Sequence, residues 1–277
     1  MLTTLNPRIF FGCAVLLALV FTAVFAPWLA PHDPLTQDLL YGSLPPAWSV
    51  GGEPAYLFGT DTLGRDILSR LIFGAQPALI VAVAGAGLAA IIGVSLGLMA
   101  GFRGGWIDSS ISRLVDVWMA FPAVLLSIVL VAILGAGLGS VVLAIAIIDW
   151  TRFCRVVRAE TMQQAQLDYV VSARTIGFTG FQTLTREVLP NLWPLILTLF
   201  TLEMGIAIVV EAILSFVGLS VSSDMPTWGS LIRDGRLYVN QIPWLLGLPV
   251  LAIAITVLGL NALGDGLREA LDPSVRV

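Results

Sequence analysis

The chain has 277 residues, of which 57% are hydrophobic and only 12% charged, and its formal net charge is −4. Soluble domains are about 45–50% apolar and about 25% charged, so this composition excludes an ordinary water-soluble enzyme and a disordered chain. All 14 basic residues are arginine, which excludes a GxxxxGK[ST] phosphate-binding loop and a Schiff-base lysine. One histidine and two cysteines are too few for a zinc site built by this chain alone. The negative charge gives no footprint for nucleic acid.

Six apolar segments predict an all-α integral membrane protein, because about 20 mostly apolar helical residues cross a bilayer core of about 30 Å. The predicted spans, in chain order, are residues 9–30, 77–101, 117–134, 140–154, 192–219 and 242–263. The fourth is short and contains Asp149, so we expect it to lie among other helices rather than against lipid. Five spans remain the alternative if the third and fourth segments are misread.

The first segment has a second interpretation as a cleaved signal peptide, since Arg8 precedes it and the small residue Ala26 lies near its end. The apolar run is long for such a peptide and Pro27 follows Ala26 directly, which favours a retained helix. We therefore divide the chain into residues 1–76, which hold this helix and an outside loop, and residues 77–277, the core of the membrane domain.

The distribution of arginine predicts that both ends of the chain lie in the cytoplasm, because cytoplasmic loops carry the excess of basic residues. With the N-terminus inside, ten of the 14 arginines, Arg152 and Arg276 among them, fall in cytoplasmic segments. The four outside are Arg65, Arg70, Arg233 and Arg236. An N-in, C-in chain requires an even number of spans, in agreement with six.

Small residues recur at every fourth position of the second predicted span. They are Gly85, Ala89, Gly93, Gly97 and Gly101. A spacing of four is just over one helical turn, so these residues form one smooth stripe that lets two helix backbones approach closely. The stripe predicts either packing within the chain or a surface where two subunits meet.

Residues 155–191 form a polar segment that is too long for a simple connector and lies on the positive side. Apolar residues recur in it at spacings of three and four, which predicts one amphipathic helix with a single apolar stripe. The residues of this stripe are Met162, Ala165, Tyr169, Ala173 and Ile176. Gly177 is placed to end the helix as a C-terminal glycine.

A second helix is predicted directly after Gly177, because Thr179 and Gln182 match the T-x-x-Q capping box. Its own apolar face consists of Phe181, Leu184, Val188 and Leu189. Pro190 stops or kinks it before the next span. The resulting hairpin on the inner membrane face has two interpretations: a solvated connector that lies on lipid, or a docking element for a cytoplasmic partner.

Residues 168–191, DYVVSARTIGFTGFQTLTREVLPN, resemble the EAA loop of ABC-importer permeases. Ala173, Gly177 and Leu189-Pro190 match the motif, whereas Val171 and Ser172 stand where the family often has glutamate and alanine. Asp168 is the nearby acidic residue that could take the place of that glutamate. The resemblance implies that this loop contacts an ATPase subunit through Asp168, Ser172, Ala173, Arg174, Gly177 and Phe178.

Similarity to the second, C-type permease of dipeptide, oligopeptide and nickel importers extends along nearly the whole chain. It is carried by FGTDTLGRDILSRLIFG at 58–74, GFRGGWID at 101–108, Asp116 with Phe121-Pro122, EAILSFVGL at 211–219, PTWGS at 226–230 and NALGDGLREALDP at 261–273. The resemblance implies the transmembrane domain of a type I ABC importer, in a multi-pass protein of the bacterial inner membrane.

The same resemblance implies the partners. A homologous second permease would share the path for di- and oligopeptides, two ATP-binding subunits would hold ATP and magnesium, and a periplasmic or extracellular solute-binding protein would deliver the solute. This chain itself would bind no cofactor or metal and perform no covalent chemistry. Uptake of nickel or a metal chelate is the alternative, because closely similar permeases carry it.

Glu203 and Glu211 are costly in an apolar segment, since a central charge costs about 2.5–3.5 kcal/mol on insertion scales. They lie eight residues apart, a rotation of about 80°, so both can face the bundle interior. They predict either a lining of the translocation path or a buried hydrogen-bonded pair. A proton-driven secondary carrier is a further alternative that would use these acids.

Asp61 and Asp66 predict a turn that opens a helix at residues 67–73, with Asp66 capping it and pairing with Arg70 four residues on. A magnesium-dependent membrane transferase is the competing interpretation of the two acids. His32 is expected in a solvated loop. Cys13 and Cys154 are expected to be packed or lipid-facing thiols.

Overall fold

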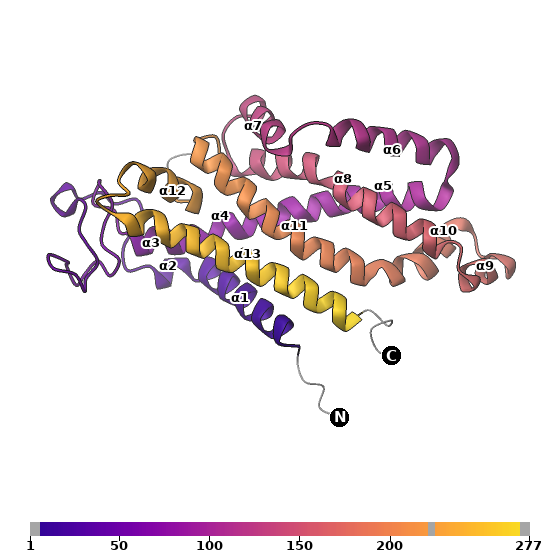
Figure 1. Ribbon diagram of the computed structural model, residues 1–277, viewed down its shortest axis with the longest axis horizontal. Coiled ribbons are helices and arrows are strands. Elements are labelled where there is room, and N and C mark those ends of the chain that lie inside the picture. Colours follow the sequence, from indigo (N-terminus) through magenta and orange to yellow (C-terminus); the bar gives the residue numbers. More distant parts are fainter. Residues whose placement is uncertain (1–5, 221–224, 272–277) are drawn as a thin grey trace.

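The computed structural model describes residues 6–220 and 225–271, which form a bundle of helices (Figure 1). The last two residues of the motif at 261–273, and Arg276, lie outside this part of the chain. In chain order, the elements up to Arg103 are α1 (Pro7–Val24), α2 (Ala26–Leu29), η1 (Leu39–Tyr41), α3 (Ile67–Phe73), α4 (Ala75–Ile80), the π-helical η2 (Val81–Gly85) and α5 (Ala86–Arg103).

The remaining elements complete the bundle. They are α6 (Gly105–Met119), α7 (Ala123–Leu134), α8 (Leu138–Gln164), α9 (Asp168–Thr175), α10 (Gly180–Thr183), the π-helical η3 (Leu184–Val188), α11 (Leu189–Val217), α12 (Trp228–Leu237) and α13 (Pro243–Leu271). In Figure 1, α3, α12 and the loop before α3 lie at one end of the long axis. Helices α9 and α10 lie at the other end, toward which the start of α1 and the finish of α13 also point.

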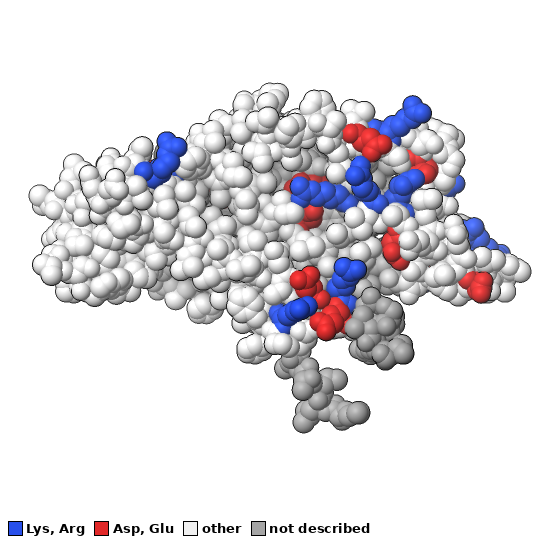
Figure 2. All heavy atoms as spheres, viewed as in Figure 1, with Lys and Arg blue, Asp and Glu red and all other residues white. Residues whose placement is uncertain are grey.

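The two ends of the bundle also differ in charge. On the face shown in Figure 2, acidic and basic side chains gather over the half of the molecule that holds α9 and α10, and the opposite half is almost free of them. The positive-inside rule therefore assigns the α9 end to the cytoplasm. This places both described chain ends and the hairpin on one side, as the sequence predicts.

Within residues 6–220 and 225–271, four helical rods are long and apolar enough to cross a membrane, and the bent pair α6–α7 makes a fifth if it is one span. The four are Pro7–Val24, Ile67–Arg103, Gly180–Val217 and Pro243–Leu271. The membrane fold is thus confirmed, but this count falls short of the predicted six. The difference is α8, whose second half carries three arginines and a glutamate.

The boundaries of the third and fourth predicted spans are wrong. The third, 117–134, crosses a break at residues 120–122, where α6 and α7 meet at 87°; Pro122, which has no N–H to donate, directly precedes α7. The fourth, 140–154, continues to Gln164 within α8. Nothing in the chain stops it earlier, and ion pairs from Arg155 to Asp116 (3.0 Å) and from Arg158 to Asp108 tie its polar half to α6.

The small-residue stripe packs within the chain, where α5 lies against α8. A Cβ added at Gly97 would come within 2.7 Å of the Cys154 carbonyl oxygen, and one at Gly101 within 2.6 Å of the Arg158 carbonyl oxygen. At Gly93 the same atom would overlap the Trp150 carbonyl oxygen. The two backbones therefore touch, so the stripe is covered by α8 rather than left for another subunit.

At the opposite end of the bundle, Arg70 does not pair with Asp66, the partner that the sequence predicts. Its guanidinium binds Asp61 at 2.5 Å and Asp234 of α12 at 3.1 Å, and Arg65 binds the same Asp61 at 2.7 Å. Asp66 instead caps α3 by accepting the Ser69 N–H at 3.0 Å. With Asp61 held by two arginines, the pair of acids is structural, and the magnesium interpretation has no support.

His32 is half-buried rather than solvated. Its ring stacks on Tyr56 with centroids 4.8 Å apart, and its backbone N–H donates to Ser69 Oγ at 3.0 Å. The loop before α3 is thereby fastened to the start of that helix. Cys154 is buried in the contact between α5 and α8, and Cys13 is partly exposed on α1.

Gly97→Ala should lower the free energy of unfolding by about 1–3 kcal/mol, because one methyl group must be accommodated between two touching backbones. The measurement is the melting temperature of the purified protein. Gly87→Ala is the matched control on the same helix, since a Cβ there meets nothing within 4 Å. Equal melting temperatures for the two variants would contradict the proposed close contact.

Candidate functional site

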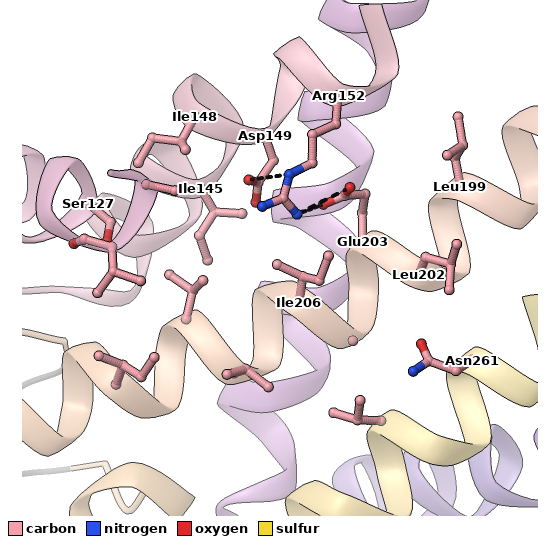
Figure 3. Close-up of a pocket in the computed structure, with 17 residues that line it drawn as sticks. Ser127, Ile145, Ile148, Asp149, Arg152, Leu199, Leu202, Glu203, Ile206 and Asn261 are labelled. Atoms are coloured by element: carbon pink, nitrogen blue, oxygen red, sulfur yellow. Dashed lines mark hydrogen bonds and ion pairs between the residues drawn. The ribbon is translucent and has the colours of Figure 1, made fainter. Parts of the chain in front are cut away.

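A cavity of about 570 Å³ lies between α7, α8, α11 and α13 (Figure 3). Its wall is mainly apolar, with side chains such as Ile145, Leu202 and Ile206. The polar groups come from Ser127 of α7, Asp149 and Arg152 of α8, Glu203 of α11 and Asn261 of α13. A mostly apolar pocket with a few convergent polar groups is the usual form of a small-molecule site.

The charges in this cavity do not balance. Arg152 Nη1 lies 3.2 Å from Glu203 Oε2, and Arg152 Nε lies 4.0 Å from Asp149 Oδ1. Both carboxylates are buried, while 37% of the Arg152 side chain is exposed. If all three groups are ionised, two acids face one base in apolar surroundings, and the site attracts cations.

Sequence reasoning missed Arg152, which was assigned to a cytoplasmic segment. It lies within α8 because that helix continues past the predicted end of the fourth span. Two signals could have located it. Asp149 and Arg152 are three residues apart, which places them on one helix face, and a buried acid such as Glu203 requires a cation from a neighbouring helix.

Glu211 lies apart from the cavity. It is fully buried and accepts hydrogen bonds from Ser215 Oγ at 2.6 Å and Ser220 Oγ at 3.1 Å. Ser215 Oγ in turn accepts from Thr227 Oγ1 at 2.8 Å. Of the two glutamates expected to face inward, one therefore lines the cavity and the other belongs to a hydrogen-bonded cluster that holds the end of α11 to the start of α12.

The turn between α9 and α10 forms as the sequence predicts. Gly177 has φ 100°, a conformation that glycine adopts without strain. Its N–H donates to the Arg174 carbonyl and the Phe178 N–H donates to the Ala173 carbonyl, both at 3.1 Å, which is a Schellman motif. Thr179 and Gln182 form the predicted capping box at the start of α10.

The prediction of a single amphipathic helix from Met162 to Ile176 is wrong, because the chain turns between Gln164 and Asp168. Leu167 adopts an extended conformation there, so α9 is a separate helix from α8. Three members of the predicted stripe, Met162, Tyr169 and Ile176, are exposed. The turn instead brings Val170 into an apolar cluster with Leu98, Val157, Val188 and Leu192.

Pro190 does not stop the second helix. One helical rod extends from Gly180 to Val217, and the π-helical turn η3 immediately precedes the proline. A π turn shifts the hydrogen-bond pattern from i→i+4 to i→i+5, so the missing N–H of Pro190 is accommodated without a break. The hairpin is therefore continuous with α11, which lines the cavity.

The six residues predicted to contact the ATPase divide between two environments. Asp168, Ser172, Arg174 and Gly177 are exposed, whereas Ala173 is buried and Phe178 half-buried. Sequence reasoning missed two apolar side chains that point outward, Val171 at 50% and Ile176 at 76% exposure. Little in the sequence indicated that these side chains point outward, since the apolar spacing that includes Ile176 indicated burial.

A bundle of spanning helices with a charged cavity, continuous with an exposed hairpin at its charged end, defines the membrane-spanning subunit of a transporter. Residues 93–277 match the family described as binding-protein-dependent transport system inner membrane component, and residues 6–46 match the N-terminal TM domain of oligopeptide transport permease C. The chain belongs to the family of binding-protein-dependent transport system inner membrane components. It is a multi-pass protein of the bacterial inner membrane.

Several curated proteins are similar over most of their length. The di/tripeptide transport system permease protein DppC of Pseudomonas aeruginosa is 41% identical over 96% of this chain and 88% of its own. The glutathione transport system permease protein GsiD of Pectobacterium atrosepticum is 40% identical over 96% and 86%. The oligopeptide transport system permease protein OppC of Bacillus subtilis is 37% identical over 96% and 85%.

Arg152→Ala should lower the free energy of unfolding by about 1–3 kcal/mol, because it leaves the buried Glu203 carboxylate without its hydrogen-bonded cation. Adding Glu203→Gln to that variant should restore part of the loss, since the uncompensated charge is then gone. Thermal unfolding of the purified protein measures both. Arg155→Ala is the control, because its exposed pair with Asp116 contributes about 0–1 kcal/mol. A double variant no more stable than Arg152→Ala would contradict the pairing.

Proposed function

We propose that this chain is a permease subunit of an ATP-driven importer and that it forms, with a homologous second permease, a path for di- and oligopeptides. The observation that carries the proposal is 37–41% identity, over 96% of the chain, to permeases named for dipeptide, oligopeptide and glutathione transport. A solute-binding protein delivers the solute on the side of α12.

The cavity between α7, α8, α11 and α13 is the part of the path that this chain contributes. A peptide carries an ammonium group. The cavity holds two carboxylates, Asp149 and Glu203, and one guanidinium, Arg152, and this excess of negative charge favours a cation within the membrane-spanning bundle. The apolar remainder of the wall offers no fixed hydrogen bonds to a particular side chain. Such a lining suits a set of related solutes rather than one.

Coupling to ATP is the role we assign to the hairpin. Two ATP-binding subunits hold ATP and magnesium, and this chain performs no covalent chemistry. The docking surface consists of the exposed face of α9, with Asp168, Val171 and Ser172, and of Ile176 directly after the helix. Because α10, η3 and α11 form one continuous rod, a push on the hairpin reaches Glu203 through rigid helix.

Reconstitution tests this function. Proteoliposomes with this chain, the second permease, both ATP-binding subunits and the binding protein should accumulate labelled dipeptide only with ATP and magnesium. Liposomes with this chain alone should neither accumulate peptide nor hydrolyse ATP. Accumulation of nickel but not of peptide would refute the peptide assignment, and uptake by the chain alone would refute the role as a subunit.

Ile176→Asp should weaken binding of the ATP-binding subunits roughly 30-fold, as expected when an apolar contact of about 2 kcal/mol is lost from an interface. The measurement is retention of those subunits during purification on tagged permease. Ser110→Asp adds the same charge to an exposed position of α6 and should leave retention unchanged. Equal retention in both variants would place the ATPase contact elsewhere.

A further inference from the structure

A groove of about 900 Å³ lies between the C-terminal turns of α5 and the hairpin, well away from the charged cavity. Its floor and walls are mostly apolar. The apolar lining residues are Leu98, Met99, Phe102, Phe178, Phe181, Leu184 and Leu189. This volume and this lining suit an elongated apolar ligand.

Two arginines, Arg103 and Arg174, also line the groove, and no acidic side chain does so among the residues described. Within the same part of the chain, neither arginine has a carboxylate within 4.0 Å. By contrast, Arg152, Arg155 and Arg158 of α8 are each paired with an acid. The groove therefore combines an apolar wall with positive charge that no carboxylate neutralises.

Arg174 is turned toward the groove rather than toward the docking surface of α9. Its guanidinium carbon lies 4.6 Å from the centroid of the Phe102 ring, a cation–π contact that fixes it beside the end of α5. Arg103 is the last residue of α5. The two guanidinium groups thus come from two different elements that meet at the groove.

The groove is continuous with a surface of the kind that faces lipid. Leu88, Ile91, Ile92 and Met99 are exposed along α5, which belongs to the apolar rod Ile67–Arg103. The rod ends at Arg103, on the side that the arginine distribution assigns to the cytoplasm. Basic pockets between spanning helices on that side are suited to anionic head groups.

From this arrangement we infer that the groove binds an anionic phospholipid of the cytoplasmic leaflet. The phosphate lies between Arg103 and Arg174, whose planar guanidinium groups can each donate two hydrogen bonds to it. One acyl chain follows the apolar wall formed by Met99, Phe102 and Leu184. This binding requires neither the transported solute nor ATP.

The test uses the complete transporter complex, with phosphatidylglycerol as the probe. The complex is reconstituted into phosphatidylcholine discs with increasing phosphatidylglycerol, and retained lipid is counted by native mass spectrometry. Arg103→Ala/Arg174→Ala should weaken retention roughly 30-fold, which corresponds to about 1 kcal/mol for each arginine. Arg103→Lys/Arg174→Lys should retain more lipid than the alanine pair. Arg155→Ala, outside the groove, should retain as much as the unmodified complex.

A photo-reactive residue at Thr185, which also lines the groove, identifies the occupant directly. A phosphatidylglycerol adduct supports the inference, and an adduct to an ATPase or permease subunit overturns it. Unchanged lipid retention in the double alanine variant also overturns it. Because Arg174 lies on α9, lipid retention rather than uptake is the readout, so a defect in coupling cannot be mistaken for loss of lipid.

Discussion

The backbone contact between α5 and α8 sets the positions of the helices around it. Lipid gives helices no hydrophobic reason to associate, so close packing through small residues must hold them together. Gly93, Gly97 and Gly101 bring α5 against carbonyl groups of α8. That contact fixes one side of α8, and its other sides then carry Arg152 toward α11 and Arg158 toward Asp108 of α6.

The pair between Arg152 and Glu203 connects this fixed helix to one that continues into the hairpin. A buried carboxylate is tolerated because its cation lies 3.2 Å away on α8. If a push on the hairpin rotates α11 relative to α8, the pair must stretch or break, and negative charge is then uncovered in the cavity. A solute with an ammonium group can then take the place of Arg152, so movement and affinity are linked by one interaction.

Local signals in the sequence were sufficient for features that involve neighbouring residues. The cap formed by Asp66, the capping box of Thr179 and Gln182 and the left-handed Gly177 depend on contacts within five residues, and all three were predicted. The stripe of small residues identified a packing surface, but not its partner. The helical membrane fold and the position of the hairpin followed from composition and charge. The predicted count of six spans did not, because the described residues give four, or five with the bent pair α6–α7, and α8 carries too much charge to be counted.

The errors share a physical cause, which is that ion pairs are chosen by tertiary structure. Arg70 has Asp66 four residues away, yet it binds Asp61 and Asp234, because the loop before α3 folds back and α12 packs beside it. Arg152 lies in a polar stretch that predicts cytoplasm, yet α8 continues through it and α11 supplies Glu203. Spacing along one helix cannot identify partners that another helix brings.

Helix α9 has only eight residues. Its docking surface for the ATPase and the side that carries Arg174 are therefore mechanically linked. Ile176 and Val171 point outward to the proposed ATPase contact, while Arg174 is held over Phe102 at the lipid-side groove. Two turns of helix move as a unit, so a displacement that engages Ile176 must also shift Arg174 relative to Arg103. A phosphate bound between the two arginines would resist that shift. The lipid inference therefore implies that anionic lipid sets the resting position of the hairpin against which ATP-driven closure acts.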